Sequence, residues 1–257
     1  MPKESLPQKS IRILKTEGVG SLFKKAGGRI DHKLKPLKRV LVPRAKRAIE
    51  TLDPEESNVD FLIKFASDNF AGLIRPAQVR YEITELANVV KKMHPKSVME
   101  IGTANGGTLF LWSRLADAYA TVISMDLPGG EFGGGYPEWK INLYKTFARP
   151  QQRLHLLRED SHSASAVEKV RRILDDNPLD FLFIDGDHTY EGVKKDFELY
   201  SPLVRKGGVI AFHDIAVHPV ESGCLVDRFW NEIKKEDSRE VIADRGQKWA
   251  GIGIYRV

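Results

Sequence analysis

The sequence predicts an α/β fold with a mostly parallel seven-stranded sheet that closes on an antiparallel last strand. Two observations lead to this prediction. Short apolar runs alternate with amphipathic helical patterns from residue 76 onward, which is typical of βαβ units. The stretch 97–126 has the order strand, glycine-rich turn, helix, strand and acid. We therefore expect a nucleotide-like ligand at the carboxyl edge of the sheet, where open α/β sheets bind ligands.

Apolar runs and helical spacing place the elements in chain order. A connector over residues 51–75 contains a short helix, and Pro76 suits the first turn of the next helix. We expect strands over residues 98–101, 121–125, 153–157, 179–184, 209–212, 240–243 and 251–257. We expect helices over residues 59–65, 76–93, 109–115, 141–147, 191–200 and 227–235, and one through Val167, Val170 and Ile173. The last two strands read as a hairpin, which makes the closing strand antiparallel.

The composition is that of a globular chain. The 257 residues are 42% hydrophobic, with a mean hydropathy of −0.33, and suffice for one α/β domain and an appendage. No run approaches the ~20 apolar residues that span a bilayer, and the N-terminus lacks the apolar core of a secretory signal. The single Cys224 excludes an intramolecular disulfide and indicates a reducing compartment, so we expect a cytoplasmic location.

Positive charge is concentrated in residues 1–50, which hold fourteen Lys and Arg against four Asp and Glu. Apolar residues recur among them at helical spacing, which predicts short basic amphipathic helices. Such a segment can lie on the inner face of an anionic membrane or on a glycolipid, or serve as a solvated arm or a homo-oligomer contact. Sparse aromatic residues argue against nucleic acid. We divide the chain into an N-terminal extension and connector, residues 1–75, and a main domain, residues 76–257.

A glycine-rich turn from Gly102 to Gly107 follows the first strand of the sheet. Glycine allows a positive φ and close approach of a ligand, and the helix that follows directs unpaired N–H groups at it. Three residues separate Gly102 from Gly106, whereas the dinucleotide pattern G-x-G-x-x-G has one, which disfavours a nicotinamide-dependent oxidoreductase. Asp126 ends the second strand, where an acid can bind both hydroxyls of a ribose.

A glycine-rich loop follows Asp126, with five glycines between Gly129 and Gly135. So much backbone freedom beside a ligand acid predicts a mobile lid, with an ordinary flexible loop as the alternative. Tyr136 and Trp139, just beyond these glycines, either cover the ligand or belong to the core.

Two further strands end in acids. The apolar run 179–184 stops at Asp185, and the next strand ends at His213 and Asp214. The crossover between them makes the strands parallel neighbours, so these groups are expected to meet at one edge. Close carboxylates repel unless a cation lies between them, and Mg²⁺ takes such oxygen ligands. His188 is placed to accept the proton of a substrate hydroxyl.

These motifs resemble known enzymes. The run E-I-G-T-x-x-G-G from Glu100 resembles the first motif of class I S-adenosylmethionine-dependent methyltransferases, which have a Rossmann-like sheet. The run F-I-D-G-D-H-T-Y-E-G-V-K-K-D-F, with a later G-G-V-I-A-F-H-D, resembles the group that contains sugar and antibiotic O-methyltransferases and the cephalosporin hydroxylase and rhamnosyl methyltransferase-like proteins. The resemblance covers residues 76–257.

The resemblance implies methyl transfer from S-adenosylmethionine to a hydroxyl of a sugar or glycosylated small molecule, assisted by Mg²⁺ or another divalent cation. It implies cofactor contacts from Glu100, Gly102, Thr103, Asn105, Gly106, Gly107, Asp126, Asp160, Ser161 and Asp185. Ser161 can equally be a helix N-cap. By the resemblance, Asp185 and Asp214 match metal ligands and His188 matches the general base. His213 is a third candidate for the metal, and Asp185 and His213 complete the candidate catalytic set.

One departure from the group concerns His213. Metal-dependent relatives pair Glu-Asp or Asp-Asn where this chain has His213 and Asp214. His213 therefore ligates the metal, acts on the substrate, or marks a member that has lost the metal. A non-catalytic protein that docks a membrane or partner through residues 1–50 is a further alternative, which the paired acids argue against. The loop 215–225, with His218, Glu221 and Cys224, is expected to wall the substrate pocket.

Overall fold

The computed structural model describes residues 39–130, 132 and 135–257. Residues 44–257 form one compact unit. The basic helices are predicted for residues 1–50, of which residues 1–38 lie outside the described residues. The domain start predicted at Pro76 stays a prediction, although the connector before it packs on the main fold: Phe65 stacks on Phe110 with ring centroids 5.5 Å apart.

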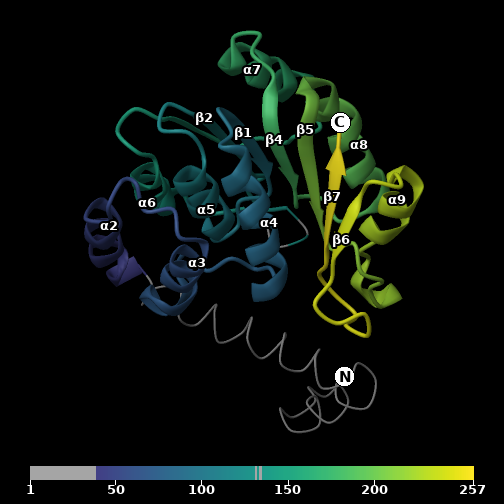
Figure 1. Ribbon diagram of the computed structural model, residues 1–257, viewed down its shortest axis with the longest axis horizontal. Coiled ribbons are helices and arrows are strands. Elements are labelled where there is room, and N and C mark those ends of the chain that lie inside the picture. The colour runs from purple at the N-terminus through teal and green to yellow at the C-terminus, as the bar shows by residue number, and fades with distance from the viewer. Residues whose placement is uncertain (1–38, 131, 133–134) are drawn as a thin grey trace, which may run out of the picture. The chain divides into compact units, whose positions relative to one another are not determined.

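Seven strands form a single sheet in the order β3-β2-β1-β4-β5-β7-β6 (Figure 1). The strands are β1 Ser97–Ile101, β2 Thr121–Met125, β3 Arg153–Leu157, β4 Leu179–Ile184, β5 Val204–His213, β6 Arg239–Val241 and β7 Ile252–Arg256. The first five pair in parallel, and β7 is antiparallel to both of its neighbours. The predicted fold class is therefore confirmed, and the carboxyl ends of β1 to β5 share one edge.

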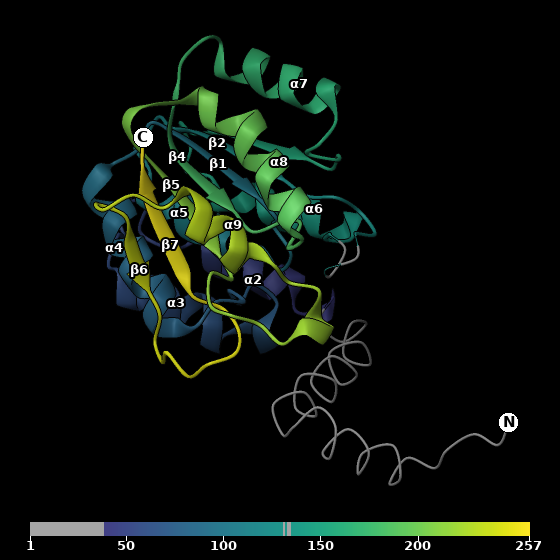
Figure 2. The ribbon, with the colours of Figure 1, turned by 90° about the vertical axis from the view of Figure 1, so that its right-hand side faces the viewer.

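Helices cover both faces of this sheet (Figures 1 and 2). The α-helices are α2 Val42–Glu50, α3 Val59–Asp68, α4 Arg80–Met93, α5 Gly107–Leu115, α6 Ile141–Tyr144, α7 Ala164–Leu174, α8 Tyr190–Tyr200 and α9 Val226–Ile233. Short 3₁₀ turns are η1 Phe70–Gly72, η2 Glu138–Lys140, η3 Lys145–Phe147, η4 Ser201–Leu203 and η5 Val220–Ser222. Among the described helices, none has the length and apolar character needed to cross a membrane.

Alternate residues of β4 pack in the hydrophobic cores on opposite faces of the sheet. Phe181 and Phe183 lie edge-on to Trp112 of α5, with centroids 5.1 and 5.7 Å apart. Leu182 and Ile184 belong instead to the core cluster that contains residues of α7, α8 and α9. Side chains alternate along a strand, so a strand buried on both faces must be apolar throughout. This explains the continuous apolar run that predicted β4.

Helix α4 begins later than predicted. Its N-cap is Val79, whose backbone is extended, so the helix starts at Arg80 and Pro76 is not its first residue. A Cβ on Gly107 would lie 2.2 Å from the Pro76 nitrogen, which shows that this segment packs closely on the start of α5. That tertiary contact holds Pro76 out of the helix.

Two other boundaries differ from the expectation. The predicted helix over residues 141–147 is divided into α6 and η3. Strand β5 starts at Val204 rather than at residue 209, and its pairing with β4 shifts register between Leu179 and Phe181. The strand therefore begins before the predicted residue 209 and contains an irregularity near its start.

Candidate active site

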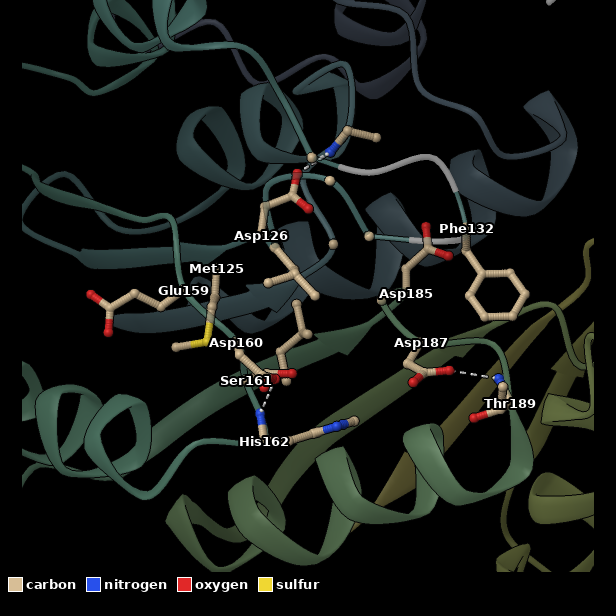
Figure 3. Close-up of a pocket in the computed structure, with 18 residues that line it drawn as sticks. Met125, Asp126, Phe132, Glu159, Asp160, Ser161, His162, Asp185, Asp187 and Thr189 are labelled. Carbon is tan, nitrogen blue, oxygen red and sulfur yellow. Dashed lines mark hydrogen bonds between the residues drawn. The ribbon is translucent and has the colours of Figure 1, made fainter.

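A cavity of about 350 Å³ opens at the carboxyl edge of the sheet (Figure 3). Its lining includes Gly102 after β1, Asp126 after β2, Asp160 and Ser161 after β3, and Asp185 after β4. Segments that are far apart in the chain thus converge where the sequence analysis expects a ligand. Parallel strands bring their ends to one edge, which is the physical reason for this convergence.

Gly102 allows the ends of β1 and β4 to approach each other. Its φ is +93°, and a Cβ there would lie 1.9 Å from the carbonyl oxygen of Asp185. The Asp185 N–H donates to Ile101 O at 2.8 Å, and the Gly102 N–H donates to Met125 O at 2.8 Å. Any side chain at position 102 would separate the strand ends that form the cavity wall.

The other glycines of the turn serve packing. A Cβ on Gly106, whose φ is +78°, would lie 2.6 Å from the ring of Tyr144. Gly107 contacts the Pro76 backbone as described above, and neither glycine lines the cavity. Glycine is therefore required in this turn for two reasons. Gly102 shapes the cavity, and Gly106 and Gly107 allow neighbouring segments to pack closely.

Three more predicted cofactor residues lie behind the cavity wall. Thr103 Oγ1 shares a hydrogen bond with Ser124 Oγ, and Asn105 Oδ1 accepts one from Lys140 Nζ at 3.1 Å. Glu100 is fully buried and accepts a hydrogen bond from Ser124 Oγ at 3.2 Å. Burial raises the pKa of Glu100 to about 8, so this carboxyl is protonated at neutral pH. These residues support the turn from behind.

Asp126 is anchored by the turn that it faces. Its Oδ2 accepts a hydrogen bond from the Ala104 N–H at 2.9 Å. Burial raises the pKa of the Asp126 carboxyl, although backbone N–H groups, first that of Ala104, act in the opposite direction. Figure 3 shows Asp126 and Asp185 around the same opening. An acid held in this way is suited to accept hydrogen bonds from ligand hydroxyls.

Ser161 lines the cavity but does not cap a helix. The N-cap of α7 is Ser163, whose Oγ accepts from the Ala166 N–H at 3.2 Å. The predicted capping role of Ser161 was therefore wrong, because the chain makes one more turn before α7 begins. Asp160 Oδ1 accepts from the His162 N–H at 2.9 Å, as Figure 3 shows.

Two acids and two histidines form a cluster beside this cavity, in which His213 and Asp214 are buried and Asp185 and His188 are partly exposed. His213 Nδ1 lies 3.0 Å from Asp185 Oδ1 and 3.3 Å from Asp214 Oδ2. His188 Nδ1 lies 3.2 Å from Asp214 Oδ2, and its Nε2 lies 3.5 Å from Asp185 Oδ1. The structure thus brings together all four residues predicted for the chemistry, and Asp185 belongs to both the cluster and the cavity.

The charges within the cluster control its protonation. Burial would raise the pKa of Asp185 and Asp214, but the neighbouring histidines, first His213 and then His188 with His218 at Asp214, together outweigh it and lower both pKa values. Burial would lower the pKa of His213 and His188, but the same carboxylates raise both. Both acids are therefore ionised, and His213 Nδ1 carries the proton that it shares with them when no cation lies between.

Three partners hold the acids from outside the cluster. Gln78 Nε2 donates to Asp185 Oδ2 at 2.6 Å. His218 Nε2 and the Ala250 N–H both donate to Asp214 Oδ1, at 3.1 and 3.0 Å. His218 is predicted in the pocket wall, whereas Gln78 was not predicted, because nothing in the sequence around residue 78 indicates a contact with Asp185.

The loop after β2 reaches the cluster through one aromatic ring. Phe132 stacks on His188 with centroids 4.9 Å apart and planes 25° from parallel, and it also lines the cavity. Tyr136 is only 2% exposed and lies edge-on to Tyr144. Of the two roles considered for Tyr136, the core role is the one that the structure supports. The mobile lid stays a prediction.

Asp185, His213 and Asp214 could together hold a divalent cation. Each offers one ligand atom, and these atoms lie within 4.8 Å of one another. Two ionised carboxylates and an imidazole at adjacent strand ends have the charge and the donor atoms that such an ion requires. The residues therefore fit a cation.

Comparison with known proteins relates this part of the chain to a family. Residues 99–215, slightly less than half of the chain, match a family model described as a methyltransferase domain. This segment is similar to that methyltransferase domain. The matched residues run from β1 to just past Asp214, so they include Gly102, Asp126, Asp185 and His213. The family resemblance noted in the sequence is confirmed.

Two relatives of known sequence match part of this chain. An uncharacterized protein of Acanthamoeba polyphaga mimivirus is 34% identical over 157 residues, which are 59% of this chain and 65% of that protein. An uncharacterized protein of Sinorhizobium fredii (strain NBRC 101917 / NGR234) is 29% identical over 151 residues, which are 56% of this chain and 16% of that protein. The chain thus matches less than two thirds of either relative.

The fold of the domain is found in solved structures. A Klebsiella pneumoniae protein assigned to the O-methyltransferases superposes with a TM-score of 0.51 at 16% identity, over 82% of this chain and 94% of that one. At this identity the similarity concerns the fold alone.

Proposed function

We propose that this protein transfers the methyl group of S-adenosylmethionine to a hydroxyl of a sugar or a glycosylated small molecule. One observation supports this most: a single cavity extends from Asp126 to Asp185, and Asp185 also belongs to the cluster that contains His188. A donor site and a proton acceptor are thus adjacent within a methyltransferase domain.

The cavity supplies the donor half of the reaction. Asp126 would accept hydrogen bonds from the ribose hydroxyls, as acids at the end of the second strand do in related sheets. Gly102 lets the backbone approach the ligand closely, and Asp160 and Ser161 lie at the far wall, where they would contact the adenine. The negative charge of Asp185 would lie toward the sulfonium group, which it attracts.

The cluster supplies the acceptor half. The acceptor hydroxyl would give its proton to His188, and its oxygen would attack the methyl carbon as the carbon–sulfur bond breaks. S-adenosylhomocysteine leaves, and the positive charge of the donor ends on His188. Asp185 and Asp214 flank both nitrogens of that ring, so they stabilise the imidazolium. A cation held by Asp185, His213 and Asp214 would lower the pKa of the hydroxyl.

The choice of a sugar hydroxyl rests on the sequence around the cluster. The run from Phe183 to Phe197, with His213 and Asp214, resembles sugar and antibiotic O-methyltransferases. The basic segment of residues 1–50 suggests that the acceptor or its carrier lies on an anionic membrane. Most of this segment lies outside the described residues. Flotation of the full chain with anionic and with neutral vesicles tests that contact.

The experiment for the main proposal uses S-adenosylmethionine with a labelled methyl group. The chain is incubated with free sugars, nucleotide sugars and glycosides, and the products are separated by mass. We expect a gain of one methyl group on an acceptor hydroxyl and binding of S-adenosylmethionine in calorimetry. Binding of a nicotinamide cofactor without binding of S-adenosylmethionine would contradict the proposal.

A further inference from the structure

We propose that the cation site of this protein prefers a nitrogen-seeking transition ion, such as Fe²⁺, Co²⁺, Ni²⁺ or Zn²⁺, over Mg²⁺. This inference deepens the proposed function and rests on it. It concerns a feature of this chain itself, because it depends on the imidazole of His213 standing between two carboxylates.

The donor atoms of the site are mixed. His213 Nδ1 lies within 3.3 Å of an oxygen of each carboxylate, so an ion that bridges Asp185 and Asp214 would also meet this nitrogen. Mg²⁺ takes oxygen ligands in near-ideal octahedral geometry and keeps several waters. Imidazole suits Fe, Ni, Cu and Zn, whereas sites for Mg²⁺ consist of carboxylate, carbonyl and water. The nitrogen therefore shifts the preference away from Mg²⁺.

The fold fixes this nitrogen in place. His213 is the last residue of β5 and pairs with Ile252 of β7, and its side chain is 6% exposed. Its other ring nitrogen, Nε2, is buried and has no hydrogen-bond partner among the described residues. The pairing with β7 and the low exposure of the side chain restrict the movement of His213. We therefore expect the imidazole in the ligand set of an ion bound between the two carboxylates.

A second group of donors beside the site has the same preference. His188, Asp214 and Cys224 each offer a ligand atom within 4.8 Å of the others, and Asp214 is common to both groups. Cys224 is buried. Thiolate and imidazole are ligands of soft and borderline ions. The surroundings of Asp214 thus offer nitrogen and sulfur, neither of which favours Mg²⁺.

The test compares metal affinities of the full chain after removal of metal with a chelator. Co²⁺ binding is followed by its visible absorption, and Mg²⁺ and Zn²⁺ binding by calorimetry. The His213→Glu variant has the all-oxygen ligand set of the metal-dependent relatives. We expect the ratio of Co²⁺ affinity to Mg²⁺ affinity to be at least about tenfold higher in the natural chain than in His213→Glu, the scale on which ligand-shell changes act.

Two controls make the outcome decisive. Loss of near-ultraviolet charge-transfer absorption in Cys224→Ser would show that the thiolate binds Co²⁺. The ratio of Co²⁺ affinity to Mg²⁺ affinity should nevertheless stay higher in Cys224→Ser than in His213→Glu. An equal ratio in the natural chain and His213→Glu would overturn the inference, as would the absence of any metal binding. If His213→Glu does not fold, displacement of Co²⁺ from the natural chain by equimolar Mg²⁺ would overturn it. Calorimetry with S-adenosylmethionine on the metal-free chain tests the proposed function separately.

Discussion

The donor half and the acceptor half of the candidate site are built in different ways. The turn after β1 is shaped by backbone: Gly102 allows two strand ends to touch, and Ala104 anchors Asp126 through its N–H. The cluster after β4 and β5 is built from charged side chains that lie within about 3.5 Å of one another. The donor half is thus defined by the path of the backbone, and the acceptor half by the charges of its side chains.

This difference predicts different consequences for substitutions. A change in the donor half should alter cofactor affinity or folding, because it moves backbone or removes a hydrogen bond to the ligand. A change in the acceptor half should alter the rate of methyl transfer, because it removes a proton acceptor or the charges that tune it. The four predictions below test this division, from the largest expected effect to the smallest.

Asp185→Ala should abolish measurable turnover. Asp185 is the residue that both halves share, and its loss leaves His188 and His213 without one of their two acids. The measurement is the initial rate with labelled S-adenosylmethionine. Asp180→Asn is the matched control, because Asp180 lies at the opposite end of the same strand. If this variant folds, it should be as active as the natural chain. Turnover in Asp185→Ala close to that of the natural chain would show that the halves are not joined through this residue.

His188→Gln should lower kcat by about 10²–10⁴-fold, the usual contribution of a general base. Glutamine keeps hydrogen-bonding capacity but cannot take up a proton, so the affinity for S-adenosylmethionine should stay nearly constant. Rates and calorimetry on the same preparation separate the two effects. His155→Gln, on the edge strand β3, controls for loss of a histidine. A loss of less than about threefold in His188→Gln would remove this residue from the mechanism.

Asp126→Asn should weaken the binding of S-adenosylmethionine by about 10–100-fold, since a hydrogen bond to a charged group contributes about 1.5–3 kcal/mol. At saturating cofactor the rate should change little, in contrast to His188→Gln. Calorimetric titration gives the dissociation constant directly. A variant with natural affinity and a reduced rate would reverse the roles assigned to the two halves.

Glu100→Gln should change how stability depends on pH. The pKa of Glu100 is about 8 in the folded chain against an ordinary 4.5, so between these values the folded state holds a proton that the unfolded state has lost. The unfolding free energy of the natural chain therefore falls as pH rises, by up to about 1.4 kcal/mol per unit, and levels off above pH 8. Urea unfolding at pH 5 and pH 8 should show a smaller fall in Glu100→Gln. Identical falls would contradict the buried, protonated carboxyl.

The parts of the site that end parallel strands were predictable from sequence. Asp126 and Asp185 each follow a clear apolar run, and parallel strands necessarily bring such positions to one edge. His213 and Asp214 follow for the same reason. The central strands β1, β2 and β4 were predictable as well, because burial on both faces leaves a continuous apolar signal.

The parts that depend on tertiary packing were not predictable. Gln78 lies before α4 and donates to Asp185, 107 residues further along the chain, in a segment where Pro76 packs against Gly107. Gly106 and Gly107 stay predicted ligand contacts, and their packing against Tyr144 and Pro76 could not be foreseen because those residues are distant in the chain. Capping by Ser163 instead of Ser161 depends on the path of a loop, which local sequence does not determine.

The most direct test of the joined site is a crystal structure of the chain with S-adenosylmethionine bound. We predict the ribose hydroxyls on Asp126, the sulfonium beside Asp185, and the methyl group directed toward His188. A donor seated elsewhere on the sheet, or bound in this cavity with its methyl group turned away from His188, would contradict the account.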